Sequence, residues 1–184
     1  LDRLRADEVA WLVELRTAAG DWLEAHARMH RWLRTHPVGT LGANERAIVR
    51  LAYPNRYAEE IRAATATYAW PARVFHALVR EESLFNARVV SHAGAKGLAQ
   101  LMPGTARDTA RKLGVTLAEE DLFEPAVNTR LGAAYFDQVL RYVGGNPCLA
   151  MAAYNAGPGR VDEWTAARGN LPLDEWVERI PFRE

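Results

Sequence analysis

The chain is poor in the features that mark disulfide-rich, nucleic-acid-binding and membrane-spanning proteins. Its 184 residues include one cysteine, Cys148, which excludes an intramolecular disulfide; its apolar neighbours predict a small core residue. Basic and acidic side chains number 23 each, so no overall positive field favours nucleic acid or an anionic membrane. No apolar run approaches the roughly 20 residues of a membrane span, and no signal peptide opens the sequence. The chain is long enough to bury roughly 70% of its unfolded surface.

Apolar residues recur at helical spacing along most of the chain, and no sustained alternation predicts a major sheet. The pattern therefore predicts an all-α protein. In the N-terminal part we expect one helix ending at Gly20, a second ending at His36-Pro37, and a short third over 44–52. The expected inward residues of the first two are Leu4, Trp11, Leu12, Leu15 and Ala19, and then Trp22, Ala25, His26, Met29 and Leu33.

Prolines delimit the helices of the second half, because proline fixes a helical φ and its missing N–H costs little in a first turn. Helices are expected to begin close to Pro71, Pro103, Pro125, Pro147 and Pro158. Residues 87–97 hold two glycines and no helical stripe, which predicts an irregular loop or a short hairpin. The helix from Pro125 should be the longest, with its inward residues being Val127, Leu131, Ala134, Tyr135, Val139 and Tyr142.

The helix near Pro71 carries a carboxylate at the end of its apolar face. On the 3.6-residue period, Glu82 follows the face of Phe75, Leu78 and Val79, whereas Glu81 points elsewhere. Burial and the negative end of the helix dipole both disfavour the ionised form, which predicts a raised pKa for Glu82. Such a group is suited to general acid catalysis near neutral pH. From the helix alone, the alternative is a solvated surface carboxylate.

Four sequence blocks follow one another downstream in a fixed order. They are Arg80 to Ser83 with Asn86, Ser91 to Gly94 leading into Gly97 to Ala106, Asn128 to Gly132, and Ala153 to Gly159. A fifth, Ile180 to Glu184, is similar to the start of a closing motif. In this order and spacing the chain resembles the soluble lytic transglycosylases over about residues 68–184. The catalytic domain of that family is lysozyme-like and cleaves bacterial peptidoglycan.

The resemblance implies a site with one carboxylate, without cofactor or metal. In the family, a glutamic acid protonates the oxygen between N-acetylmuramic acid and N-acetylglucosamine. The carboxylate then takes the proton of the muramyl C6 hydroxyl, which attacks C1 and gives a 1,6-anhydromuramyl end without water. The match assigns this role to Glu82, and Glu81 is the rival. Four other acidic residues lack a motif and are expected to be surface charges, namely Asp121, Glu124, Asp162 and Glu163.

The resemblance also implies a set of substrate-binding residues, namely Ser83, Ser91, Gln100, Met102, Tyr154 and Asn155. Structural alternatives stay open for four of them. Ser83 can bond the local backbone, and Met102 and Tyr154 can fill a core. Asn155 can cap a helix C-terminus. Ala99 replaces a methionine common in the family, which should widen the groove slightly or be neutral, and the terminal Glu184 matches a groove glutamate.

By the same resemblance, residues 1–54 should form the end of an α-superhelix and residues 55–184 a catalytic domain related to goose-type lysozyme, cut short at its C-terminal end. The expected partner is the glycan strand of peptidoglycan, in the periplasm of the bacterial cell envelope. Two alternatives stay open: a lysozyme-type muramidase, in which water attacks, and a non-catalytic glycan-binding module. His26 and His30 have metal-compatible spacing, but no third ligand accompanies them, so no metal site is predicted.

Overall fold

The computed structural model describes residues 6–19, 21–35, 49–50, 53–169 and 171–181. Within these ranges the regular structure is helical, apart from isolated β-bridges that join Lys96 to Val90 and to Leu101. The helices are α1 (Ala6–Ala18), α2 (Trp22–Thr35), α4 (Ala58–Thr65), α5 (Ala72–Ser83), α6 (Pro103–Lys112), the 3₁₀ turn η1 (Glu120–Phe123), α7 (Pro125–Tyr142), α8 (Pro147–Ala156), α9 (Pro158–Arg168) and α10 (Leu173–Glu178). The prediction of an all-α protein is confirmed. None of the helices in these ranges combines the length and apolar character needed to cross a bilayer.

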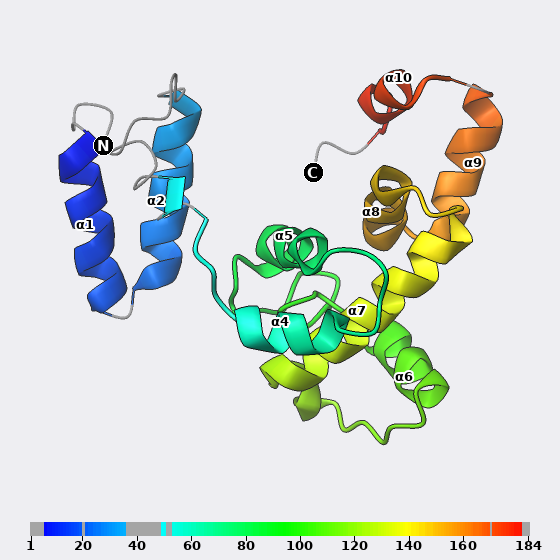
Figure 1. Cartoon of the computed structure of the whole chain (residues 1–184), viewed down its shortest axis with the longest axis horizontal. Helices are drawn as coiled ribbons and strands as arrows, with labels where there is room; N and C mark the ends of the chain where they lie inside the picture. Colours follow the sequence, from blue (N-terminus) through cyan, green and yellow to red (C-terminus); the bar gives the residue numbers. More distant parts are fainter. Residues whose placement is uncertain (1–5, 20, 36–48, 51–52, 170, 182–184) are drawn as a thin grey trace.

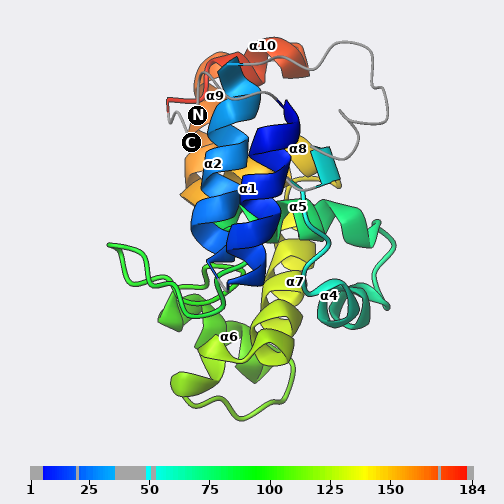
Figure 2. The same cartoon turned by 90° about the vertical axis from the view of Figure 1, so that its left-hand side faces the viewer.

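α1 and α2 form a pair that lies apart from the other helices in Figure 1 and runs side by side in Figure 2. The buried apolar residues of this pair are Val9 and Val13 of α1 and Met29 and Trp32 of α2. The inward face predicted for α1 is wrong at Trp11 and Leu15, which are 64% and 51% exposed. α1 carries apolar residues on several sides, so periodicity alone did not identify the side that meets α2.

Part of the N-terminal prediction lies outside the described residues. Of the helix expected over 44–52, only residues 49–50 are described, and they are helical. Leu4 and the side chains of Trp22, Ala25, His26 and His30 also lie outside the described part.

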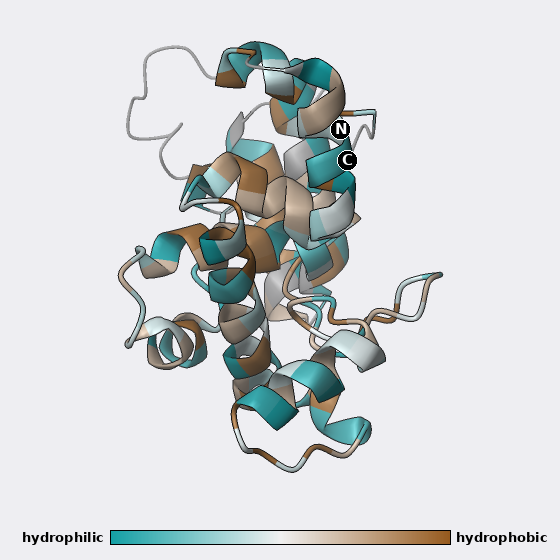
Figure 3. Cartoon of the chain, turned by 90° about the vertical axis from the view of Figure 1, so that its right-hand side faces the viewer, coloured by the Kyte–Doolittle hydropathy of each residue, from teal (hydrophilic) through white to brown (hydrophobic). Residues whose placement is uncertain are grey.

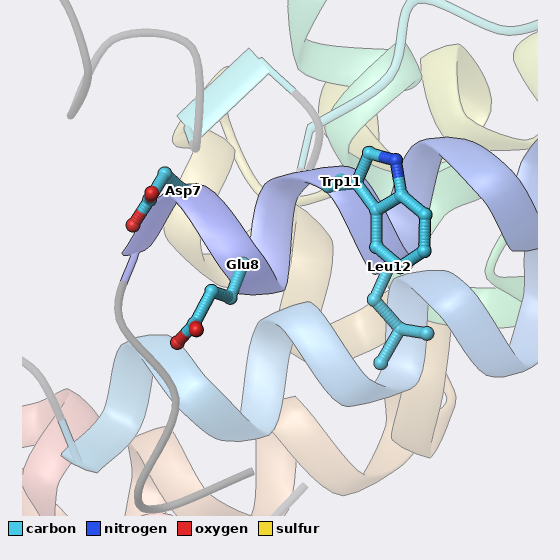
Figure 4. Close-up of a pocket in the computed structure, with 4 residues that line it drawn as sticks. All are labelled: Asp7, Glu8, Trp11 and Leu12. Atoms are coloured by element: carbon cyan, nitrogen blue, oxygen red, sulfur yellow. The ribbon is translucent and has the colours of Figure 1, made fainter.

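A hollow of about 430 Å³ lies against α1, lined by Asp7, Glu8, Trp11 and Leu12. Figure 4 shows the two carboxylates one turn before the two apolar side chains. None of the predicted catalytic or binding residues lines this hollow. It is therefore not a candidate for the predicted chemistry.

α7 is the central helix of the second part, with α4, α6 and α8 packed against it (Figure 1). The fully buried rings of Phe75 and Phe136 lie 6.4 Å apart, and Trp70 meets Phe136 edge-on at 5.1 Å. In Figure 3 the hydrophobic segments, drawn in brown, gather in the middle of the stack of helices. This aromatic centre ties α5 to α7 and so fixes the base of the catalytic helix predicted from the sequence.

Two residues expected in the core lie at the surface. Tyr142 is 58% exposed, and its hydroxyl donates to the Asp162 carboxylate of α9. Cys148 is exposed in the first turn of α8, because it lies two residues before the buried Ala150 and thus on another side of the helix. Both errors fall at helix ends, where an apolar pattern constrains the buried face least.

α7 approaches its neighbours most closely at Gly132. A Cβ placed there would lie 2.5 Å from the Cβ of Ala99 and 2.9 Å from Cζ of Phe75. Carbon atoms in van der Waals contact stay about 3.5–4.0 Å apart, so only glycine allows this approach. Gly132 therefore lets the segment around Ala99 and the α5 helix pack on the same point of α7.

Replacing Gly132 with alanine should lower the free energy of unfolding by about 1–3 kcal/mol, because the new methyl group overpacks a buried contact. The measurement is urea unfolding of the wild type and the Gly132→Ala variant. Gly104→Ala is the matched control, since nothing lies within 4 Å of a Cβ there. In the first turn of α6 this control should be neutral or stabilising by up to about 1 kcal/mol. Equal effects of the two changes would contradict the close-approach explanation.

His76 of α5 is half-buried, with Nε2 3.0 Å from the carbonyl oxygen of Arg56. Its ring lies 4.9 Å from that of Phe85. Since a carbonyl only accepts, Nε2 donates here, and the neutral ring already satisfies the contact. Burial lowers the pKa of His76 below 6.5, and the bond to the Arg56 carbonyl opposes this with a smaller effect.

A lowered pKa in the folded state means that the unfolded chain binds the proton more readily. This contribution to stability is present above the unfolded pKa of 6.5 and is lost as the pH falls below it. His76→Gln should therefore lose less stability than the wild type between about pH 7 and pH 5.5, measured as the urea midpoint. The exposed His92 provides the control, and His92→Gln should keep the wild-type pH dependence. An unchanged pH dependence in His76→Gln would contradict this role of burial.

Candidate active site

Glu82 lies in the last turn of α5 and is half-buried. The helix ends in a turn whose two residues, Leu84 and Phe85, have φ values of 48° and 61°. This left-handed conformation is unfavourable for residues with a Cβ, but the ring of Phe85 is fully buried and holds the turn in place. The predicted apolar face of the helix is confirmed by the burial of Phe75, Leu78 and Val79. The position of Glu82 is therefore set by packing on both sides of it.

Glu81 has different surroundings from Glu82. Its side chain is 69% exposed and forms an ion pair with Arg80, whose side chain is only 8% exposed. The guanidinium of Arg80 also lies 4.1 Å from the centre of the Tyr53 ring. Glu81 is thus engaged on the side of the helix that faces the segment before α4.

Tyr154 of α8 lies close enough to Glu82 for the charge of the carboxylate to act on its hydroxyl. Its hydroxyl is buried and donates to the carbonyl oxygen of Ala99 at 2.8 Å. Burial raises the pKa of Tyr154 well above 10, and the charges of Glu82 and Tyr135 raise it further. The phenol therefore stays protonated and keeps its donor role across the physiological pH range. The site thus combines the end of α5, the segment around Ala99, and α8.

Asn128 of α7 fixes the segment that carries Ala99. Its side chain is fully buried, and its Oδ1 accepts the N–H of Ala99 at 2.7 Å. Its Nδ2 donates to the carbonyl oxygens of Lys96 at 3.0 Å and Leu122 at 2.8 Å. Gly97 makes this possible, because a Cβ there would lie 2.3 Å from Nδ2 of Asn128. One asparagine therefore satisfies three backbone groups of two separate segments.

Gln100 follows in the same segment, in a left-handed conformation with φ 46°. Its Nε2 donates to the carbonyl oxygens of Gly97 at 2.8 Å and Val89 at 3.3 Å. Both contacted atoms only accept, so the orientation of the amide is fixed and its two N–H groups are used. The remaining polar atom, Oε1, can only accept. A ligand group that binds Gln100 through this side chain must therefore be a donor, such as a hydroxyl or an acetamido N–H.

The two predicted serines make local backbone contacts. The hydroxyl of Ser83 is buried and donates to the carbonyl oxygen of Val79 at 3.0 Å, which is the backbone alternative considered for it. The hydroxyl of Ser91 accepts the N–H of Ala95 at 3.0 Å and stabilises the turn before Lys96. Residues 87–97 thus form the short hairpin-like loop predicted. The substrate contacts of both serines stay predictions.

Met102 and Asn155 are both exposed. Met102 precedes α6 and is 43% exposed, so it does not fill the core. Asn155 lies inside α8, whose C-terminal cap is Gly157 with φ 88°, so the capping alternative for Asn155 is wrong. Ala99 is fully buried against Gly132, and the suggestion that it widens a groove is not supported. Glu184 lies outside the described residues.

Sequence reasoning did not identify the structural role of Asn128. The residue was noted only as the first of the block that ends at Gly132. An amide inside the apolar pattern of a long helix is a detectable signal, since such a group needs partners when buried.

Within the described ranges, no group of three or more histidine, cysteine, aspartate or glutamate side chains could hold a metal ion.

Comparison with known proteins identifies the family. The sequence model of the family described as "Transglycosylase SLT domain" matches residues 59–177. The chain belongs to this SLT family. A Haemophilus influenzae relative is 34% identical over 184 residues, which are 99% of this chain and 30% of that protein. The soluble lytic murein transglycosylase of Escherichia coli K12 is 36% identical over 135 residues, 72% of this chain and 21% of that protein. The SLT chain therefore spans 30% or less of the length of these relatives.

Solved structures agree with this assignment. An inactive variant of the lytic transglycosylase Slt from Pseudomonas aeruginosa superposes with a TM-score of 0.80 at 34% identity, covering 98% of this chain and 28% of that one. A 70-kDa soluble lytic transglycosylase in complex with bulgecin A gives a TM-score of 0.81 at 27% identity, covering 99% and 28%. The predicted lysozyme-like fold class of the SLT chain is confirmed.

Replacing Asn128 with aspartate should lower the free energy of unfolding by about 2–4 kcal/mol, because a buried carboxylate cannot donate to the carbonyl oxygens of Lys96 and Leu122. The measurement is urea unfolding. Asn146→Asp is the matched control, since Asn146 uses only its Oδ1, which accepts the N–H groups of Cys148 and Leu149 at the start of α8. Aspartate caps a helix equally well, so this change should stay within about 0.5 kcal/mol. A mild effect of Asn128→Asp would show that the segment does not depend on the two donors.

Proposed function

We propose that the chain is a lytic transglycosylase that cleaves the β-1,4 bond between N-acetylmuramic acid and N-acetylglucosamine in peptidoglycan. The observation that carries the proposal is the setting of Glu82, a half-buried residue whose charge acts on the buried Tyr154 hydroxyl. Because Tyr154 is anchored to Ala99, the carboxylate has a rigid neighbour on one side. A carboxylate that exchanges protons with a substrate catalyses the reaction better when its position is fixed.

In the proposed reaction Glu82 acts first as an acid and then as a base. It gives its proton to the glycosidic oxygen, and the bond from that oxygen to muramyl C1 breaks. The resulting carboxylate accepts the proton of the muramyl C6 hydroxyl as O6 bonds to C1. The products are a free N-acetylglucosamine 4-hydroxyl and a 1,6-anhydromuramyl end, and Glu82 regains its proton. No water is consumed.

The contacts of the other acidic side chains support a one-carboxylate mechanism. Asp121 accepts a backbone N–H, Asp162 accepts a tyrosine hydroxyl, and Glu163 lies 3.6 Å from an arginine of its own helix. Glu124 is exposed at the start of α7. A reaction in which the substrate supplies its own nucleophile does not need the second carboxylate of a hydrolytic glycosidase.

The named relatives support this function. The Pseudomonas aeruginosa structure is of a variant made inactive by exchange of a glutamate for glutamine, which is the change expected to disable an acid–base glutamate. The Escherichia coli relative is named for murein, which is peptidoglycan. These names support our proposal that the chain acts on peptidoglycan of the bacterial cell envelope, in the periplasm.

We further propose residues 1–54 as the end of a superhelical segment and residues 55–184 as the catalytic domain. The SLT match begins at residue 59, shortly after this boundary. α1 and α2 bury apolar residues in a pair of their own, which fits a unit distinct from the helices around α7. The contact between Arg80 and Tyr53 joins the two parts next to the candidate site.

Glu82→Gln should slow the release of anhydromuramyl ends at least about 100-fold, because glutamine can neither give nor take the proton. The measurement is mass spectrometry of purified peptidoglycan after digestion, scoring anhydromuramyl against reducing muramyl ends. Glu81→Gln is the neighbouring control and should retain most of the activity, since Glu81 is exposed and paired with Arg80. Glu82→Gln should unfold at the same urea concentration as the wild type, whereas Glu81→Gln should unfold at a somewhat lower one, because the nearly buried Arg80 loses its paired carboxylate.

Each other outcome points to a different function. Reducing ends that disappear in Glu82→Gln would make the chain a muramidase that uses water at the same site. Equal losses of cleavage activity in Glu82→Gln and Glu81→Gln would contradict the assignment of the acid–base role to Glu82 alone. Binding of peptidoglycan without cleavage by the wild type would indicate a non-catalytic module.

A further inference from the structure

A second pocket lies between the segment after α4 and the C-terminal end of α7. Its volume is about 570 Å³, and its lining is Thr67, Tyr68, Ala69, Trp70, Asp137, Leu140, Arg141, Gly144 and Gly145. The size falls within the range of about 300–1,000 Å³ typical of small-molecule sites. None of the residues assigned to the candidate active site lines it.

One wall of this pocket is aromatic. The rings of Tyr68 and Trp70 stack with centroids 5.2 Å apart and an interplanar angle of 5°. Trp70 is anchored from behind, because it meets Phe136 edge-on and its indole Nε1 donates to Oδ1 of Asp137 at 3.1 Å. The stack is therefore a rigid surface held by the core of the domain.

The polar groups of the pocket balance one another in charge. Asp137 is buried and forms an ion pair with Arg141, whose side chain is 77% exposed. The Tyr68 hydroxyl makes no hydrogen bond within the described residues, and burial followed by the charge of Asp137 raises its pKa, so it stays a donor. Gly144 and Gly145 close the pocket without side chains, and open space lies where a Cβ would stand at either one. A ligand here meets a flat apolar face beside neutral and mutually compensated polar groups.

We propose that this pocket binds N-acetylhexosamine residues of a β-1,4-linked glycan strand, as a second carbohydrate site separate from the catalytic one. The assignment of a glycan rests on the proposed function. Sugar rings offer an apolar C–H face to aromatic rings and hydroxyl groups to tyrosine, aspartate and arginine. The compensated charge of Asp137 and Arg141 favours a neutral ligand over the charged peptides attached to the strand.

The two sites lie at opposite ends of α5. Trp70 precedes the helix, Glu82 occupies its last turn, and the 12 residues between these ends span roughly 18 Å. Binding at both ends would hold the protein on the polymer between cleavage events, because the second contact is made at a high effective concentration. The pocket should therefore matter for insoluble peptidoglycan and not for short soluble fragments.

The test uses the full chain carrying Glu82→Gln, labelled with ¹⁵N and titrated with the neutral tetramer of β-1,4-linked N-acetylglucosamine. The indole N–H resonance of Trp70, assigned by its loss in Trp70→Phe, and the amides of Gly144 and Gly145 report on the pocket. The side-chain amide of Gln100 reports on the candidate active site. Both sets should shift and saturate. Arg141→Ala should weaken binding at the pocket about tenfold, as expected for the loss of a hydrogen bond to a charged group, and leave the Gln100 shifts unchanged.

Two further variants separate the pocket from general effects on the fold. Tyr68→Phe keeps the aromatic stack and removes the hydroxyl. Like Arg141→Ala, it should weaken the binding measured from the pocket resonances. Arg111→Ala is the matched control, since Arg111 is 76% exposed and pairs with Asp108 of its own helix but does not line the pocket. With Glu82 restored, Arg141→Ala should cleave soluble fragments at the wild-type rate and be retained less on insoluble peptidoglycan.

The outcomes are distinct from those for the catalytic glutamate, because the readout is binding. Absence of shifts at Trp70, Gly144 and Gly145 while Gln100 saturates would overturn the proposal. Unchanged pocket shifts in Arg141→Ala and Tyr68→Phe would do the same. Shifts produced only by a muramyl stem peptide would assign the pocket to peptide and overturn the glycan assignment. A chain in which Glu82→Gln remains active would refute the acid–base role while leaving the pocket titration valid.

Discussion

The buried amide of Asn128 is the interaction on which the candidate site depends. Residues 96–101 lie outside the helices and are joined only by isolated β-bridges. The amide supplies the partner of the Ala99 N–H and a second donor to the carbonyl of Lys96, which also accepts the N–H of Leu101. The carbonyl of Ala99 then accepts the hydroxyl of Tyr154. Both polar groups of the Ala99 backbone are thus held by side chains of two different helices, α7 and α8. Since an unpaired buried peptide group costs about 1–3 kcal/mol, this arrangement specifies one position for the segment.

Close packing and backbone strain complete the arrangement. Gly97 and Gly132 remove the side chains that would keep the segment away from α7. Around the candidate site, the left-handed conformation is adopted by Leu84, Phe85 and Gln100, all of which have a Cβ. Each costs about 1–2 kcal/mol relative to an unstrained backbone. The burial of Phe85 and the two hydrogen bonds of the Gln100 amide offset that cost, so the strained residues stand beside the groups that hold them.

The sequence was sufficient to predict α6, α7, α8 and α9, because Pro103, Pro125, Pro147 and Pro158 open them with the φ that a first turn requires. It did not predict α10, which no such proline and no long apolar stripe marks. It was not sufficient for the buried face of α1, whose apolar residues are spread around the helix. The face of Glu82 followed from a 3.6-residue period over one helix. The contacts of Asn128 with Ala99 and Lys96 did not follow, since these partners lie 29 and 32 residues away along the chain, and no local pattern encodes that distance. For the same reason the direction of the free Gln100 oxygen required the structure.

Two adjacent glutamates of one helix end in different environments, and Arg80 supplies much of the difference. The nearly buried guanidinium forms an ion pair with Glu81 and lies over the ring of Tyr53. The charge of Glu81 is therefore compensated on the side of the helix that faces the N-terminal segment. The Nε and Nη2 atoms of Arg80 have no hydrogen-bond partner within the described residues, so the ion pair with Glu81 and the contact with the Tyr53 ring compensate its charge. Glu82 lies about 100° further around the helix, where its charge reaches Tyr154 instead. The two neighbouring carboxylates therefore lie in different surroundings, and the difference begins with a cation buried one residue before the pair.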